Sequence, residues 1–375
     1  MLRRDRRLPA ARAVFILVTV LAGWRMAGIH ATPPTAPGPS PIEGGPFDRV
    51  VYNVLTHTAL AVPGVFRQGG LSFTAPSIQY NDLTQTASTT GQCVIADATS
   101  KATSAAATVD FRRKLVSMTG GVKASFHAPA GPGHGEASGE VTCPVLQYDA
   151  TAGATTCMGG VQFSIQVPGR GTEPLRMTLA APLLSYTAAA GTVQCSGGIS
   201  GEVEGIGSLP RAGSLESGPP KPEPLRVVAS SLSYSAQAGL LEASGPVTLT
   251  ESDASARSGN LSLLKGTTLT LGGGVVYSDT SGHEVEGSEA VQDLERHVVK
   301  VAGPVIYSDR DGYSVRSSSA TLDQRTRTVT FSGDVDFTDK DGAEAFTNMA
   351  VIGTDKNGAR HVTTGPLRFR TRAAM

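Results

Sequence analysis

The stretch Leu232–Leu249, LSYSAQAGLLEASGPVTL, decides the fold of this chain. Leucine and tyrosine alternate with serine at its start, and apolar residues alternate with small or polar ones again from Leu241 onward. The segment 237–239, QAG, lies between the two runs and has the composition of a turn. Alternation with a period of two on both sides of a turn predicts a β-hairpin with one apolar face.

The same hairpin pattern recurs along the chain. Tyr234 is followed by Gly245 and then by Val247, and this order fits further places, some with another residue in place of the tyrosine and some with a shorter hairpin. The glycines that mark the copies are Gly91, Gly120, Gly159, Gly197, Gly245, Gly273, Gly303, Gly333 and Gly365. A self-similar unit of about thirty residues indicates a stacked array of supersecondary units. Because glycine weakens a strand, its fixed place predicts a bend or bulge in each copy.

Composition agrees with an all-β protein. The 375 residues include 44 glycines, only 17% are charged, and the formal net charge is zero. This balance gives no overall field to recruit nucleic acid or an anionic membrane, so we expect no nucleic-acid partner. A hydrophobic content of 40% is too high for a disordered chain.

The first 47 residues differ from the rest. Residues 1–31 combine an arginine-rich start with a short apolar run, which is the pattern of a signal peptide or of a membrane anchor. Residues 32–47 are a proline-rich linker. We divide the remainder into a section at 48–216 and a section at 225–372, because four prolines lie close together just before residue 225. Whether this break separates two bodies or bulges out of one stays open.

The turns of the later copies share an aspartate and a glycine three residues later, as in Asp309–Gly312 and Asp339–Gly342. A helix–loop–helix calcium site needs an acidic ligand at its twelfth position. Ala320 and Ala350 stand there, so we expect turn chemistry in which Asp caps the turn and Gly takes the left-handed conformation.

A single hairpin of this kind is not stable alone, but a stack of hairpins buries a continuous apolar face. In each copy the residues two and four positions before and after the glycine share that face. We therefore predict an elongated, twisted β-jellyroll or folded-over sheet built of stacked hairpin repeats. Its two ends present unpaired edge strands, which we place at residues 50–62 and 361–371.

The repeats SLSYSAQAGLLEASGPVTLTES and SATLDQRTRTVTFSGDVDFTD resemble those of the OstA-like periplasmic proteins of lipopolysaccharide transport, the group of LptA and LptC. The resemblance covers roughly residues 65–370. It implies a jellyroll that carries acyl chains in its interior and joins end to end into a bridge toward the outer membrane. The N-terminal segment matches LptC-like members, and the length of the chain leaves open a combination of an LptC-like and an LptA-like half.

The resemblance also implies partners and a location for the protein. The partners are lipopolysaccharide or a related glycolipid, other Lpt proteins joined by β-strand addition, and an inner-membrane ABC transporter. The location is the periplasm, with residues 1–31 either cleaved or kept as an inner-membrane anchor.

The hypothesis for the site is a groove for acyl chains. Alanines near the valine column, such as Ala243 and Ala302, would leave room for the lipid. Periodicity alone favours a closed core made of the same residues, and the resemblance reverses this preference in favour of the groove. The proposed lining residues are Tyr148, Val161, Tyr186, Ile199, Tyr234, Val247, Val275, Val305, Val335 and Phe337.

The four cysteines include one candidate pair for a disulfide, and the sequence contains no catalytic motif. Cys157 and Cys195 occupy the same place in consecutive copies, so they are candidates for a disulfide, with free buried thiols as the alternative. We expect no catalytic residue, no metal and no cofactor, since no catalytic or phosphate-binding motif occurs. The rival functions are a structural or adhesin-like exported repeat protein and, with weaker support, a β-solenoid enzyme such as a polysaccharide lyase.

Overall fold

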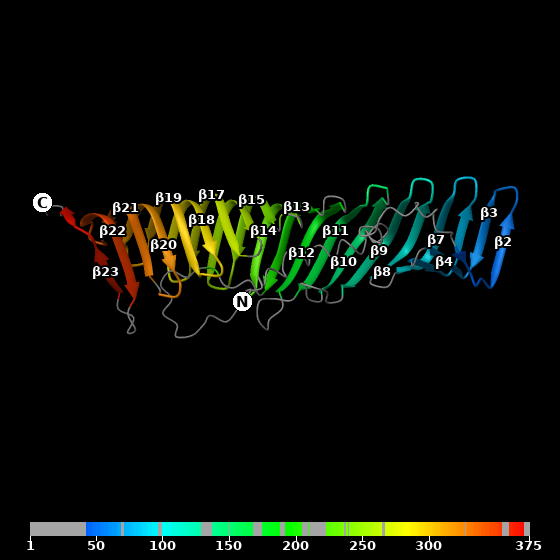
Figure 1. Cartoon of the computed structure of the whole chain (residues 1–375), viewed down its shortest axis with the longest axis horizontal. Helices are drawn as coiled ribbons and strands as arrows, with labels where there is room; N and C mark the ends of the chain where they lie inside the picture. The colour runs from blue at the N-terminus through cyan, green and yellow to red at the C-terminus, as the bar shows by residue number, and fades with distance from the viewer. Residues whose placement is uncertain are drawn as a thin grey trace, which may run out of the picture. The chain divides into compact units, whose positions relative to one another are not determined.

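The computed structural model describes residues 43–370, except 69–70, 97–99, 129–136, 150, 168–174, 188–191, 205–208, 210–222, 236–237, 239, 265–266, 327 and 355–359. The described residues form 24 strands and no helix, which confirms the all-β prediction (Figure 1). Among these residues no helix is long and apolar enough to cross a membrane. The expected signal or anchor, most of the linker and the proline-rich break lie outside the described residues.

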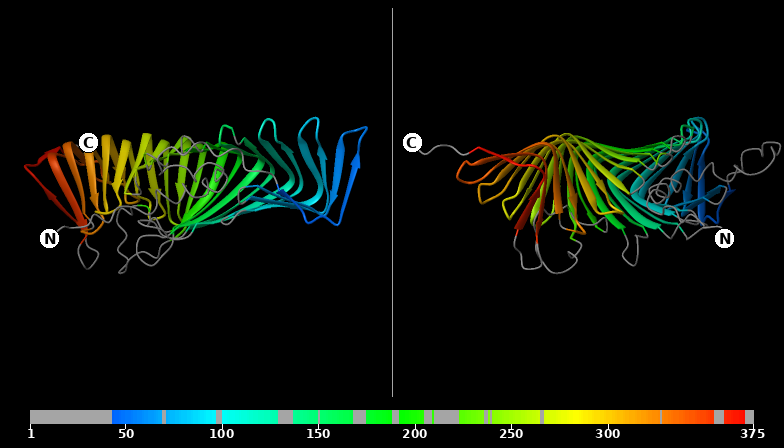
Figure 2. Two further views of the ribbon diagram at one scale, coloured as in Figure 1. Left: turned by 45° about the vertical axis from the view of Figure 1, so that its right-hand side comes forward. Right: turned by 60° about the vertical axis from the view of Figure 1, so that its left-hand side comes forward.

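The chain divides into two compact units. Unit 1 comprises Met1–Ile199 and Ser233–Gln237, and unit 2 comprises Ser200–Leu232 and Ala238–Met375. Two strands contribute to both units, β13 (Thr192–Glu204) and β14 (Leu225–Ser235). Within each unit the hairpins succeed one another in chain order and twist, as Figure 2 shows.

Unit 1 is an array of antiparallel strands in which long strands follow short ones. Strands β7 to β12 pair in sequence order, and the two halves of β7 pair with two different strands, β6 and β5. The strands are β1 (Glu43–Gly44), β2 (Arg49–Asn53), β3 (Thr58–Val62), β4 (Gly64–Gln68), β5 (Leu71–Ala75), β6 (Ile78–Asn81), β7 (Thr86–Ala96), β8 (Ser100–Asp110), β9 (Leu115–Ala128), β10 (Ala137–Asp149), β11 (Ala154–Val167) and β12 (Leu175–Thr187).

Unit 2 repeats the same antiparallel pairing from β15 to β22, with β23 and β24 both on the far edge of β22. The strands are β15 (Leu240–Thr250), β16 (Ala254–Leu264), β17 (Thr268–Asp279), β18 (Glu284–Asp293), β19 (Val298–Ser308), β20 (Ser314–Asp323), β21 (Thr328–Thr338), β22 (Glu344–Thr354), β23 (Arg360–Thr364) and β24 (Arg368–Arg370). The strand–turn–strand predicted at Leu232–Leu249 is therefore β14 followed by β15.

The predicted bulge lies at the repeated glycines. Eight of the nine have a positive φ, and the ladder register shifts at each of these bulges that the strand pairings cover, for example between Ala302 and Val305 beside Gly303. Gly365 is the exception, because it falls between β23 and β24 instead of inside a strand. Each bulge divides its strand into two limbs that meet at a corner.

The turns follow the expected aspartate–glycine chemistry. In the Asp309 turn, Gly312 N–H donates to the Asp309 carbonyl at 3.2 Å, and the Asp309 carboxylate accepts the amides of Asp311 and Tyr313. The Asp339 turn repeats these bonds. The side chain thus satisfies backbone donors that the turn leaves without a ladder partner.

Replacing the corner glycine Gly303 with alanine is expected to lower the free energy of unfolding by about 2–4 kcal/mol. Its φ of 89° disfavours a side chain, and an added Cβ would overlap the side chain of Ser288, which donates to the Ala302 carbonyl at 2.8 Å. The turn glycine Gly342 is the matched control, because its φ is 81° but nothing lies within 4 Å of an added Cβ. Gly342→Ala is expected to cost only about 1–2 kcal/mol in the same urea titration. Equal losses would contradict the close approach at the corner.

Candidate functional site

Unit 2 contains an apolar cavity between its two limbs. The bulge of β17 separates two halves of the strand. Limb A is the half Thr268–Gly272 with the residues paired to it on neighbouring strands, and limb B is the half that includes Val275–Ser278. The cavity has an empty volume of about 840 Å³, which counts the space that opens to solvent.

Limb A provides two rows of side chains that run across the strands. The strand register aligns each residue with its neighbour in the row, and both rows point into the cavity. The first row is Leu271, Ala290, Val301, Ala320 and Phe331, and the second is Leu269, Gln292, Val299, Leu322 and Val329. Alanine alternates with larger residues in the first row, and a methyl group in place of a large side chain leaves the space unfilled.

Limb B closes the opposite side with fewer residues. Val275 and Tyr277 of β17, Val285 of β18 and Tyr307 of β19 line it, and Ala256 of β16 adjoins them. The hydroxyl of Tyr277 donates to Asp279 at 3.4 Å, so its polar end is turned to a protein partner. The cavity wall is thus almost entirely hydrocarbon.

Leu209 reaches the cavity from the connection between β13 and β14. Its side chain is buried in the core of unit 2 and lines the cavity. Its backbone N–H donates to Glu251 Oε1 at 2.7 Å, although the two residues are 42 positions apart. Because a buried carboxylate is costly unless hydrogen-bonded, this bond anchors Leu209 at the cavity.

The residues proposed from the sequence are all in the interior, but only Val275 lines this cavity. Val247, Val305 and Val335 are buried in the cores of unit 2, and Phe337 packs against one of them. The other five, Tyr148, Val161, Tyr186, Ile199 and Tyr234, are buried residues of unit 1.

Most of the cavity lining is absent from the residues proposed from the sequence. Six lining residues lie two or four positions before a repeat glycine, namely Leu269, Leu271, Val299, Val301, Val329 and Phe331. The repeat frame already placed these positions on the apolar face. The prediction that Ala302 leaves space for a lipid is wrong, because this residue is exposed. The small side chains of Ala290 and Ala320 leave space in the cavity instead.

The cysteines are free thiols in the structure, and all four are buried. The disulfide expected between Cys157 and Cys195 is not formed there. Cys157 instead hydrogen-bonds with Cys143, which raises the pKa of Cys157 and lowers that of Cys143. Burial raises the pKa of Cys195 to about 11.

Two tyrosines of unit 1 give a pH prediction. Burial raises the pKa of Tyr234 to about 12, and burial followed by the charge of Tyr148 does the same for Tyr186. A tyrosine in the unfolded chain has a pKa near 10. The folded state therefore holds these protons more tightly, so its stability is fully present below about pH 10 and is lost as the pH rises toward 12. Tyrosinate absorbance during an alkaline titration checks this, and Tyr234→Phe with Tyr186→Phe is expected to flatten the loss. An unchanged loss in that double variant would contradict it.

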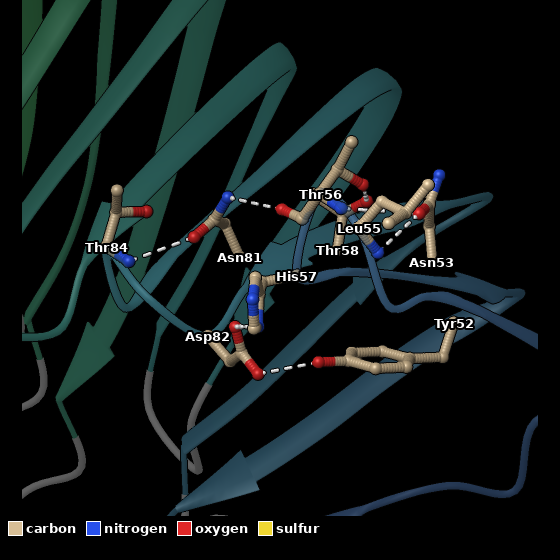
Figure 3. Close-up of polar contacts among 9 residues, drawn as sticks. All are labelled: Tyr52, Asn53, Leu55, Thr56, His57, Thr58, Asn81, Asp82 and Thr84. Carbon is tan, nitrogen blue, oxygen red and sulfur yellow. Dashed lines mark hydrogen bonds and ion pairs between the residues drawn. The ribbon is translucent and has the colours of Figure 1, made fainter.

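The hairpin β2–β3 lies in unit 1, and Figure 3 shows the polar contacts at its turn. Its turn is capped by the Asn53 side chain, which accepts the amide of Leu55 at 3.0 Å, and the Tyr52 hydroxyl donates to Asp82 at 2.8 Å. In the part of the chain that the structure describes, β2 pairs with β3 alone, and every β2 residue is exposed, including Val50 at 52% and Tyr52 at 48%. At the other expected end, β23 and β24 occupy residues 360–370, and residue 371 lies outside the described residues.

Comparisons with known proteins add partial similarity to solved structures. No family model and no curated protein matches the chain. Among solved structures, the chain is similar to LptH from Pseudomonas aeruginosa, described as the LptA homologous periplasmic component of the conserved lipopolysaccharide transport device. The match has 15% sequence identity and a TM-score of 0.29, and it covers 31% of this chain and 94% of LptH.

Proposed function

We propose that the protein binds acyl chains of a lipid in the unit 2 cavity and passes them along an exported lipid-transport assembly. The observation that carries the proposal is the hydrocarbon wall formed by the two limbs. A chain of about twelve carbons exposes roughly 0.8 kcal/mol per methylene to water, or on the order of 10 kcal/mol in all. An apolar cavity removes that barrier, and contacts of low specificity let a chain slide.

The cargo and location belong to the same proposal. The resemblance of the repeats to OstA-like proteins supports lipopolysaccharide or a related glycolipid as cargo and the periplasm as the location. Residues 1–31 would act there as a cleaved signal or as an inner-membrane anchor. Other Lpt proteins and an inner-membrane ABC transporter are the partners to test. No cavity feature calls for a catalytic role.

Photocrosslinking tests the cavity in cells that carry the lipid. Val301 lines the cavity, whereas its neighbour Ala302 is exposed, so a photoreactive residue at each site samples opposite faces of one strand. We expect an acyl lipid attached at 301 and none at 302, identified by mass spectrometry. Crosslinking at 302 alone, or purified protein free of lipid, would favour the structural repeat protein instead.

We infer further that the exposed β2 edge accepts a strand from a partner protein. Main-chain hydrogen bonds supply affinity when a strand is added to a sheet edge, and lysine on an edge prevents such pairing. Val50→Lys together with Tyr52→Lys is expected to abolish binding to purified LptA-like or LptC-like proteins of the same organism while the chain stays folded. Undiminished binding would exclude this edge.

A further inference from the structure

Gln292 is an unusual residue in the wall of the unit 2 cavity. It lies in β18, in the second row of limb A, where the register places it between Leu269 and Val299. Its side chain is buried, with 8% of its surface exposed, and it lines the cavity. The next residue but one in the row is Leu322. An amide therefore stands in a row that is otherwise aliphatic.

The Gln292 amide makes no hydrogen bond to the residues that the structure describes, and its polar atoms are not fully enclosed by protein but border the open space of the cavity. A glutamine side chain offers two donor hydrogens and one acceptor oxygen. Leaving such a group unpaired in apolar surroundings is unfavourable, and buried polar groups in native proteins are therefore nearly always paired. Another polar group of the wall, the Tyr277 hydroxyl, donates to Asp279 at 3.4 Å.

Packing within the repeat does not explain the amide. Equivalent positions of other copies hold Tyr234, which is buried, and Leu322, which lines the same cavity. Both fill the interior with hydrophobic surface, and a leucine or methionine at 292 would do so without an unpaired group. An unpaired amide in a ligand cavity is accounted for if the ligand itself supplies the partner.

We propose that Gln292 hydrogen-bonds an oxygen atom on the acyl chain, so that the cavity selects chains bearing a hydroxyl or carbonyl oxygen over plain hydrocarbon chains. This inference rests on the proposed binding of acyl chains in the cavity. A site built to hydrogen-bond its ligand rejects an analogue without the group, because the protein amide is then left unpaired.

The test compares hydroxylated and plain fatty acids on the purified full-length chain. Octadecanoate and hydroxyoctadecanoates with the hydroxyl near the start, the middle or the end of the chain displace a bound apolar dye, 1-anilinonaphthalene-8-sulfonate. An ester-bearing chain of equal length tests the carbonyl alternative. We expect at least one oxygen-bearing chain to bind about tenfold more tightly than octadecanoate, which corresponds to about 1.4 kcal/mol.

Two variants assign the preference to the amide. Gln292→Met keeps the size of the side chain and is expected to lose the tenfold preference while binding octadecanoate at least as well. The empty variant is also expected to melt at a higher temperature than the wild type, which a glutamine with a merely structural hydrogen bond would not produce. Leu322→Met, at the matching position of the next copy along the same wall, is expected to keep the preference.

Each outcome decides between the two proposals. Equal binding of all chains to the wild type, or a preference that persists in Gln292→Met, would overturn the role of Gln292 and leave acyl binding intact. If no chain displaces the dye, acyl binding in the cavity fails and the selectivity fails with it.

Discussion

Replacing Phe331 with alanine is expected to lower the free energy of unfolding of unit 2 by about 3–5 kcal/mol. Phe331 is 1% exposed and is the largest of the fully buried side chains. Its ring packs against Tyr307 with centroids 5.9 Å apart, and its row neighbours Ala320 and Ala350 are too small to fill the space that it would leave. The loss therefore combines the transfer of the ring to water with the cost of a larger cavity.

The measurement must respect the repeat architecture, because arrays of repeats unfold in steps when their cooperativity breaks down. Hydrogen exchange of β20, β21 and β22 gives the local free energy of opening, and urea unfolding gives the sum. Phe369→Ala is the matched control, since Phe369 is 75% exposed, and it is expected to change stability by less than about 0.5 kcal/mol. A loss below about 1 kcal/mol for Phe331→Ala would mean that the core around Tyr307 is not packed as described.

Much of the fold followed from the repeat. The alternation around Gly303 placed Val299, Val301, Val305 and Tyr307 on one face, and the structure has all four directed inward. The fixed glycine predicted a bulge, and the register shift beside it confirms that prediction. These features are local, because side-chain alternation and the sign of φ are properties of a few consecutive residues.

The position of the cavity depends on the spacing of the two limbs and not on the local sequence, so the repeat pattern did not predict it. Alternation shows which face of a strand is apolar, but not where the two limbs stand far enough apart to leave space. Val305 is fully buried in a packed core, whereas Val301, four residues earlier on the same strand, faces the cavity. Ala290 and Ala320 lie on the returning strands, which carry no repeat glycine, so nothing in the frame singled them out.

The same limit applies to the polar groups of the site. Gln292 stands where other copies of the repeat have tyrosine, and the repeat pattern gives it no distinct role. Its meaning appears only when the amide is seen without a partner at the cavity wall. Likewise, the bond from Leu209 to Glu251 joins residues 42 positions apart and had no sequence signal. Contacts of this kind depend on how the limbs close, which periodicity does not encode.

Filling the cavity by Ala290→Phe is expected to weaken acyl-chain binding about thirtyfold while the protein stays folded. Ala290 lies between Leu271 and Val301 in the first row of limb A, and its methyl group faces the empty space. A phenyl ring there displaces roughly two to three methylenes of a bound chain, at about 0.8 kcal/mol each, or about 2 kcal/mol in total. Dye displacement by octadecanoate measures the affinity, and thermal unfolding checks the fold.

The control places the same ring on the other face of the strand. Glu289 is exposed and directly precedes Ala290, so Glu289→Phe adds equal hydrophobic surface outside the cavity and is expected to leave binding unchanged. Overpacking a core that is already full costs about 1–3 kcal/mol, whereas filling a true cavity does not. Ala290→Phe with wild-type stability and lost binding therefore supports a site for acyl chains inside unit 2. A destabilised Ala290→Phe that still binds octadecanoate normally would show that these side chains form a closed core and that lipid binds elsewhere.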